Sequence, residues 1–381
     1  MAGCGTSALI TVALGRDAIV SDIDPLACLL TRAKCTPVDP GELMVTVEGL
    51  LDRVGPMGYR KGGLPSAEEC VSEMERKSPF RAPPNPFHWF HPTILRDLAR
   101  WLLEVHSYGD YLDYATRDAV LAITAGSIRR VSRADPKPVS GLEVTSVRRE
   151  RLRAGLRFDL RGELLARAAI LCEGYSQLLS RPRLGEVTVY EWDARRWAAL
   201  CARVNRFPDL QISSPPYLRA INYARRHKLE NFLLGLVNQS DFTARARRFL
   251  GTDVSDGLSA VDVESRLTPL CKTICSRVAR LVSEHDAVVL GRYLIDVDDW
   301  LSQVADVSRE SRGIAYVIVG ASSVGDVQID TPKLLVELAA RRGLALTYES
   351  RHSLVNQRMQ YTLRQGYRVG TESVLQFTPN N

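Results

Sequence analysis

The sequence lacks several features that would assign a protein to a class at once. It has no run of 18 or more apolar residues, so no segment is long enough to cross a bilayer as a helix. Its 8 cysteines include no Cys-x-x-Cys pair, which argues against the common structural zinc sites. With 45% hydrophobic and 25% charged residues, the composition is that of a globular chain. We therefore expect a reduced, cytoplasmic protein with no metal and no membrane segment.

The formal net charge is small, +6, but it is unevenly distributed along the chain. Between Ser127 and Ala168 there are eleven basic and five acidic residues, an excess equal to that of the whole sequence. Clustered Arg and Lys neutralise nucleic-acid phosphates and release counterions, although many such clusters are simply solvated. This stretch is a candidate surface for nucleic-acid contact.

Hydrophobic periodicity divides the chain into three segments. Residues 1–35 have the pattern of a glycine turn, a helix and a strand, which is half of a βαβ unit. Residues 36–185 begin with a stretch rich in Gly and Pro and continue with helical spacing, so we expect a largely helical insertion. Residues 186–381 alternate strands with helices, and their last two strands should form an antiparallel edge. This order predicts an α/β fold with a doubly wound, mostly parallel sheet.

The sharpest local feature is the run Ser213-Ser214-Pro215-Pro216-Tyr217, which directly follows an apolar strand. Two consecutive prolines fix the backbone and remove two N–H donors, leaving a rigid turn at the carboxyl end of a strand. Its bare carbonyl oxygens can accept hydrogen bonds from an amino group, and its aromatic ring can stack on a planar ligand. An ordinary Pro-Pro loop is the competing interpretation.

A second feature suits a cofactor that contains a nucleoside. Two glycines near the start would let the backbone approach a ligand, and a carboxylate after the next strand can hold both ribose hydroxyls. Asp193 ends a later strand, where it could bind the adenine amino group of the same cofactor or simply cap a helix. The predicted cofactor-binding residues are Gly3, Cys4, Gly5, Thr6, Asp22 and Asp193.

Together these windows resemble the S-adenosylmethionine-dependent DNA amino-methyltransferases, which modify exocyclic amino groups of bases. AGCGTSALITVALGRDAIVSDIDPLA is similar to the family's cofactor and ribose motifs, and SSPPYLRAINYARRHKLENFLLGL to its catalytic motif and following helix. The resemblance implies a class I methyltransferase-like Rossmann fold that binds S-adenosylmethionine and double-stranded DNA. Ser214 at the first position of the catalytic tetrapeptide favours cytosine N4 as the acceptor, with adenine N6 as the alternative.

The implied chemistry accounts for the residue types of the catalytic motif. The lone pair of an exocyclic amino group is delocalised into its ring, so the group is a poor nucleophile. Hydrogen bonds to Ser214 Oγ and the Pro215 carbonyl would localise that lone pair, while Pro216 stiffens the turn and Tyr217 stacks on the flipped base. No cysteine follows a proline, so the sequence lacks the Pro-Cys nucleophile of cytosine-C5 enzymes.

The resemblance also implies partners. The helical insertion of residues 36–185 would be the DNA-recognition region, and a cognate restriction endonuclease is an expected partner of such an enzyme. The side chains that we expect to contact DNA are Arg129, Arg130, Arg148, Arg149 and Arg219.

The sequence departs from the family at its start. In the family, a strand that is central in the sheet precedes the glycine motif, whereas here Met1 occupies its place. An unpaired central position would leave backbone groups without hydrogen-bond partners, so we expect that strand to come from a longer reading frame or from another chain. A partner-dependent, catalytically incomplete DNA-binding subunit is therefore the alternative to a complete enzyme.

Overall fold

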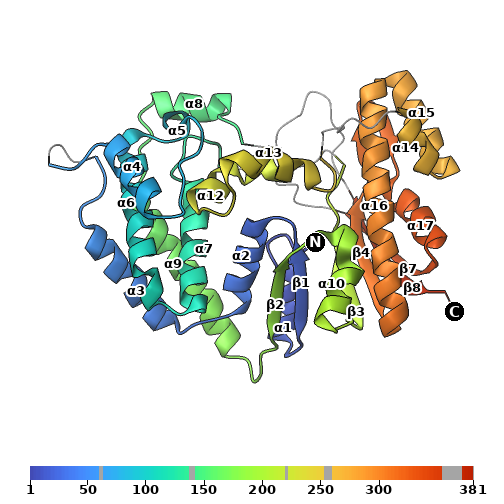
Figure 1. The fold of residues 1–381 in the computed structure, drawn as a ribbon, viewed down its shortest axis with the longest axis horizontal. Coiled ribbons are helices and arrows are strands. Elements are labelled where there is room, and N and C mark those ends of the chain that lie inside the picture. Colours follow the sequence, from blue (N-terminus) through green and yellow to red (C-terminus); the bar gives the residue numbers. More distant parts are fainter. Residues whose placement is uncertain (60–62, 137–141, 219–221, 253–259, 354–370, 381) are drawn as a thin grey trace.

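The computed structural model describes residues 1–381 except 60–62, 137–141, 219–221, 253–259, 354–370 and 381. These residues form a mixed α/β protein in which helices predominate, with a helical part at one end and strands with covering helices at the other (Figure 1). No described helix has the length and apolarity that a bilayer crossing requires.

The N-terminal segment forms the predicted turn, helix and strand. Helix α1 (Thr6–Ala13) leads to strand β1 (Ala18–Asp22), which pairs in parallel with β2 (Val187–Glu191). Helix α2 (Pro25–Cys35) begins where Pro25 occupies its first turn and the Asp24 carboxylate accepts a hydrogen bond from Leu26 N at 3.0 Å. A small N-terminal core of buried Ala8, Val12, Val20 and Cys35 holds these elements together.

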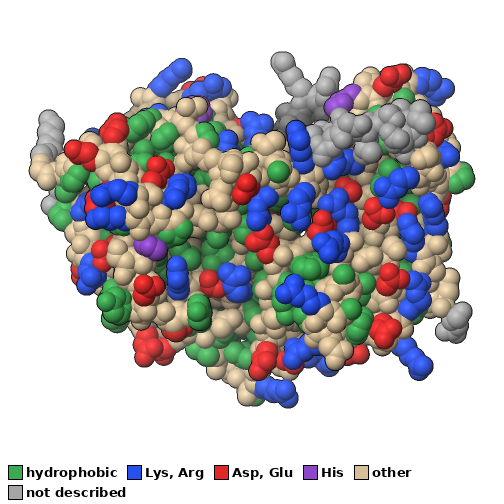
Figure 2. All heavy atoms as spheres, viewed as in Figure 1, with side chains coloured by type: hydrophobic (Ala, Val, Ile, Leu, Met, Phe, Trp, Pro, Cys, Tyr) green, Lys and Arg blue, Asp and Glu red, His purple; other side chains and the backbone are tan. Residues whose placement is uncertain are grey.

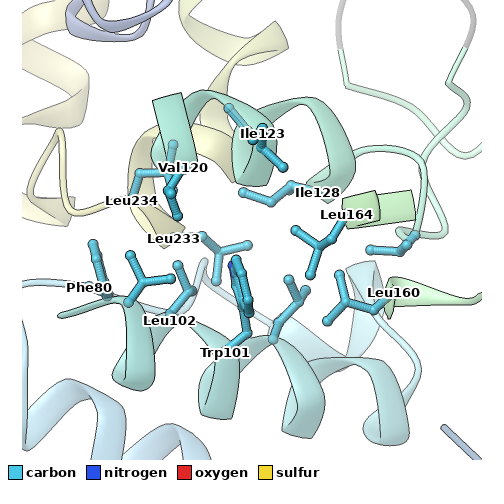
Figure 3. Close-up of a cluster of buried hydrophobic side chains, with 14 of the residues drawn as sticks. Phe80, Trp101, Leu102, Val120, Ile123, Ile128, Leu160, Leu164, Leu233 and Leu234 are labelled. Atoms are coloured by element: carbon cyan, nitrogen blue, oxygen red, sulfur yellow. The ribbon is translucent and has the colours of Figure 1, made fainter. Parts of the chain in front are cut away.

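The predicted helical insertion is confirmed as helical. Figure 3 shows its core, in which Trp101 and Leu102 face Val120 and Ile123, and Leu160 and Leu164 close the cluster. Trp101 is fully buried, and its indole N–H donates to Thr124 Oγ1 at 2.9 Å, so its one polar atom is satisfied. The helices are α3 (Pro40–Val54), α4 (Ala67–Lys77), α5 (Pro86–Trp89), α6 (Pro92–Tyr108), α7 (Tyr114–Ile128), α8 (Ser146–Arg153) and α9 (Leu160–Leu179).

The C-terminal segment contains a four-stranded sheet of order β3-β4-β8-β7. Its strands are β3 (Leu210–Ser213), β4 (Ile314–Gly320), β7 (Leu344–Ser353) and β8 (Thr371–Pro379). The predicted antiparallel edge is confirmed. The expectation of a mostly parallel sheet is met in part: β1–β2 and β3–β4 are parallel pairs, whereas β8 lies between β4 and β7 and runs antiparallel to both. Strands β5 (Ser322–Val324) and β6 (Val327–Ile329) form a separate antiparallel pair.

Helices cover this sheet and connect it to the rest of the chain. The long α16 and α17 pack against the sheet, and their apolar faces form the C-terminal core with β4 and β8. The remaining elements are α10 (Trp197–Val204), α11 (Tyr223–Arg226), α12 (Lys228–Leu233), α13 (Gln239–Arg248), α14 (Ala260–Arg266), α15 (Pro269–Leu281), α16 (Glu284–Ser311), α17 (Thr331–Arg341), β5 (Ser322–Val324) and β6 (Val327–Ile329).

Among the sheet edges without a partner strand in the described part of the chain are those of β1 and β3. β1 pairs only with β2 and β3 pairs only with β4, and Leu210 and Ile212 of β3 are 49% and 42% exposed. Met1 packs against the C-terminal core and Ala2 against the N-terminal core, and Ala2 N donates to Ser21 O at 3.1 Å. The first residues of the chain therefore lie between the two sheets, beside β1 (Figure 1).

Candidate functional site

The glycine loop is shaped by the carboxylate that ends β1. Gly3 and Gly5 have positive φ angles of 53° and 77°, which suit glycine. A Cβ on Gly5 would lie 2.6 Å from Thr31 Oγ1, so the loop approaches α2 more closely than another residue would allow. Asp22 Oδ2 accepts hydrogen bonds from Ala2 N and Gly3 N, each at 2.9 Å. The structure thus brings together the predicted residues from Gly3 to Thr6 and the predicted ribose-binding carboxylate.

Cys4 is the one exposed cysteine of the eight, and it lies in this loop. Partial burial alone would raise the pKa of its thiol, but a hydrogen bond with Thr6 Oγ1 at 3.5 Å and the positive charge of Lys34 outweigh burial and lower it. Lys34 Nζ also donates to the Cys4 carbonyl oxygen at 2.9 Å. The loop therefore presents an exposed thiol with a lowered pKa, beside the half-exposed ammonium group of Lys34.

The turn Ser214–Tyr217, predicted to be catalytic and called the catalytic turn below, directly follows β3 and has an unpredicted neighbour. Ser214 is exposed, Pro215 is buried, and the Tyr217 ring packs against the C-terminal core. The Tyr217 hydroxyl donates to Glu372 Oε1 at 2.6 Å and also hydrogen-bonds with Ser214. Burial and the Glu372 carboxylate raise the pKa of Tyr217, so the phenol stays protonated. Glu372 is the second residue of strand β8, and its position in the sequence gave no signal of this contact.

The two predicted motifs meet through side chains that the sequence reasoning missed. The Asp24 carboxylate, just after β1, lies 2.5 Å from His227 Nδ1 and accepts a hydrogen bond from Asn231 Nδ2 at 3.4 Å. Burial and the charge of Asp22 raise the pKa of Tyr223, which places that phenol beside the acidic end of β1. The segment that follows the catalytic turn is therefore fastened to the cofactor-motif segment more than 200 positions away.

Asp193 is engaged by its own neighbour. Its carboxylate caps the next turn by accepting from Arg195 N at 3.0 Å, and it forms an ion pair with Arg195 Nη2 at 2.8 Å. Burial by itself would raise the pKa of Asp193, but the bonds from Arg195 outweigh it and lower that pKa. Arg195 also pairs with Asp296 Oδ1 at 2.6 Å. The capping interpretation is confirmed, and an adenine contact stays a prediction.

The predicted DNA-contacting arginines have different environments. The prediction that Arg148 contacts DNA is wrong, because only 6% of the residue is exposed. Helix α8 packs this side chain inward over Phe158, and its guanidinium donates to Ser132 O. Arg129 is half-buried and Arg130 pairs with Glu163 at 2.7 Å. Of the other two, Arg149 is exposed and Arg219 lies outside the described residues.

No protein-family model, curated protein or solved structure matches this chain. Among the described residues, no group of three or more His, Cys, Asp or Glu side chains is arranged to hold a metal ion.

Proposed function

We propose that this chain is an S-adenosylmethionine-dependent DNA methyltransferase that transfers a methyl group to N4 of a flipped cytosine. The observation that carries the proposal is the junction between Asp24 and His227, which fastens the cofactor-motif segment to the segment after the catalytic turn. A transferase needs donor and acceptor sites in one place, and the exposed Ser214 and the exposed glycine loop belong to these two segments.

The strand order supports a class I methyltransferase-like Rossmann fold. The orders β2-β1 and β3-β4-β8-β7 would make one doubly wound sheet if a single strand lay between β1 and β3. The carboxyl ends of β1 and β3 carry the acidic residues and the catalytic turn, and ligands bind at such strand ends where the order of a sheet reverses.

The residues present fit the cofactor and the acceptor base. The left-handed loop at Gly3 and Gly5 would approach the cofactor through its backbone. Asp22 Oδ2 accepts from Ala2 N and Gly3 N and Oδ1 accepts from Asp24 N, so Oδ1 keeps the remaining acceptor site for a ribose hydroxyl. S-adenosylmethionine would supply an electrophilic methyl group, and Ser214 Oγ and the Pro215 carbonyl would accept the amino hydrogens that face them. The nitrogen lone pair would then be directed at the methyl carbon.

Tyr217 would stack on the flipped base, and Glu372 would hold its hydroxyl so that the ring keeps one orientation. A fixed ring needs no reorganisation when the base enters, which favours the reactive alignment. Adenine N6 is the second candidate acceptor, because the same turn can bind either amino group. As a cytoplasmic, DNA-associated enzyme it would act beside a cognate restriction endonuclease.

The decisive experiment combines the purified chain, S-adenosylmethionine and unmethylated bacterial DNA, followed by mass spectrometry of the nucleosides. N4-methylcytosine is expected, and Ser214→Ala should abolish it without weakening DNA binding. Detection of N6-methyladenine instead would mean that adenine is the acceptor base, and the proposed mechanism would stay the same. Wild-type turnover by Ser214→Ala would overturn the role assigned to the catalytic turn.

A partner chain that adds a strand at the open edge of β1 is the alternative to activity of the isolated chain. Ala18 N donates to Glu186 O and Asp22 O accepts from Trp192 N, so Ile19 and Ser21 direct their backbone groups to the other edge. At that edge Ser21 O already accepts a hydrogen bond from Ala2 N, and the amides of Ile19 and Ser21 are left to pair with a further strand. Pairing of a parallel strand there should slow hydrogen exchange at these two amides. If assembly with such a partner leaves their exchange unchanged, the strand does not bind at this edge.

A further inference from the structure

A second basic region follows the catalytic turn and has no part in the proposed chemistry. Between Asn222 and Arg248 the sequence has six Lys and Arg residues against two acids, a net charge of +4. One of those acids, Glu230, is buried, and burial raises the pKa of its carboxyl group. Of the two acids in this segment, which spans α11 to α13, only Asp241 is exposed.

Contacts with three other elements fix the position of α13. Arg245 pairs with Glu191 at the end of β2 at 2.5 Å. At the C-terminus of the helix, the carbonyl oxygens of Arg247 and Arg248 accept hydrogen bonds from Arg292 Nη2 at 2.9 Å and Arg195 Nη2 at 2.8 Å. Two cations thus bind the negative end of the helix dipole, which holds α13 across the top of β1 and β2 (Figure 1).

Two exposed arginines of this region have side chains without a hydrogen-bond or salt-bridge partner among the described residues. Arg225 in α11 and Arg248 in α13 are exposed, and neither side chain makes a hydrogen bond or salt bridge within the described residues. Helices α11 and α13 contact each other, so the two arginines lie on neighbouring helices. Figure 2 shows several Lys and Arg side chains gathered over α13 and just below it.

This surface borders the proposed site on both sides. Arg225 lies eight positions after Tyr217 of the catalytic turn. Arg248 is close enough to the other side of the site that its charge helps to lower the pKa of Asp193. By contrast, the arginines at 129, 130 and 148 donate to acceptors within the helical insertion, so that stretch offers less free charge than its sequence indicates.

We infer that the surface formed by α11 and α13 binds the phosphate backbone of duplex DNA beside the flipped nucleotide, with Arg225 and Arg248 as phosphate contacts. This inference rests on the proposed function, because a methyltransferase must grip the strand from which it extracts a base. Arginine suits the task because its planar fork of N–H donors matches phosphate oxygens.

The test is the salt dependence of DNA binding by the full chain, measured by fluorescence anisotropy with a labelled duplex and no cofactor. Each phosphate contact contributes about 0.9 to the slope of log K against log salt concentration, so Arg225→Gln with Arg248→Gln should lower the slope by about 1.8. If both forms bind equally at about 1 M salt, that slope corresponds to about 60-fold weaker binding at 0.1 M. The matched control replaces Arg277 and Arg280, two exposed arginines of α15, with Gln.

The outcomes separate this inference from the proposed function. A slope equal to that of the wild type, or an equal loss in the α15 control, would overturn the inference even if the chain methylates DNA. The expected slope change in a chain that forms no methylated nucleoside would uphold the phosphate surface and overturn the proposed function. Stronger competition by structured RNA than by duplex DNA would overturn the choice of DNA as the partner.

Discussion

Replacement of Asp24 by alanine should break the contacts between the two motif segments and lower the free energy of unfolding substantially. The carboxylate is only 3% exposed and accepts three hydrogen bonds: from Leu26 N as a helix cap, from His227 and from Asn231. Loss of the cap costs about 1 kcal/mol. Loss of a hydrogen bond to a charged acceptor costs about 1.5–3 kcal/mol, and the long bond to Asn231 adds less. We expect Asp24→Ala to lower the free energy of unfolding by about 3–5 kcal/mol.

The assay is urea denaturation followed by circular dichroism, with a surface pair as the matched control. Asp52 pairs with Arg161 at 3.0 Å, but its side chain is 74% exposed, so Asp52→Ala should cost less than about 1 kcal/mol. A double-mutant cycle of Asp24→Asn and His227→Gln should give a coupling free energy above about 1 kcal/mol. If Asp24→Ala costs no more than Asp52→Ala, or the cycle shows no coupling, the junction does not join the two segments.

Three further predictions concern the site itself. Cys4 should be the one thiol of the native chain that reacts rapidly with a disulfide reagent, and S-adenosylhomocysteine should protect it; Lys34→Ala should raise the thiol pKa and slow the reaction at neutral pH. Asp22→Ala should weaken S-adenosylhomocysteine binding in calorimetry by about tenfold or more, because both the ribose acceptor and the loop's anchor are lost. Tyr217→Phe should keep the stacking ring and reduce kcat by about threefold to tenfold, whereas Tyr217→Ala should abolish turnover, and equal rates for the two variants would contradict a stacking role.

Local signals predicted the elements that carry the site. The strand that ends at Asp22 and the strand that precedes the two prolines could both be predicted. Carboxylates and prolines often end strands, and this signal lies in the adjacent residues themselves. The helical insertion was equally foreseeable from its spacing of apolar residues. The insertion of β8 between β7 and β4 was not, because β4 begins 57 positions earlier in the chain and no local pattern indicates that pairing.

The same distinction explains which site residues escaped prediction. Glu372 and His227 are ordinary polar residues in the sequence, and their importance comes from contacts with Tyr217 and Asp24 at separations of 155 and 203 positions. Each contact joins elements that tertiary packing alone brings together. A sequence motif contains the residues that contact the ligand, but the residues that orient those side chains can be far away in the sequence.

Charge was the property for which sequence and structure differed most, and the reason is physical. An Arg run raises the local charge density whatever its side chains contact, yet only a guanidinium that keeps its donors free can grip a phosphate. Arg148 donates to a backbone carbonyl inside the helical insertion, whereas the exposed guanidinium groups of Arg225 and Arg248 have free N–H donors at the border of the proposed site. The salt slope of DNA binding measures that difference directly, since it counts the cations that meet phosphate and ignores those that stabilise the fold.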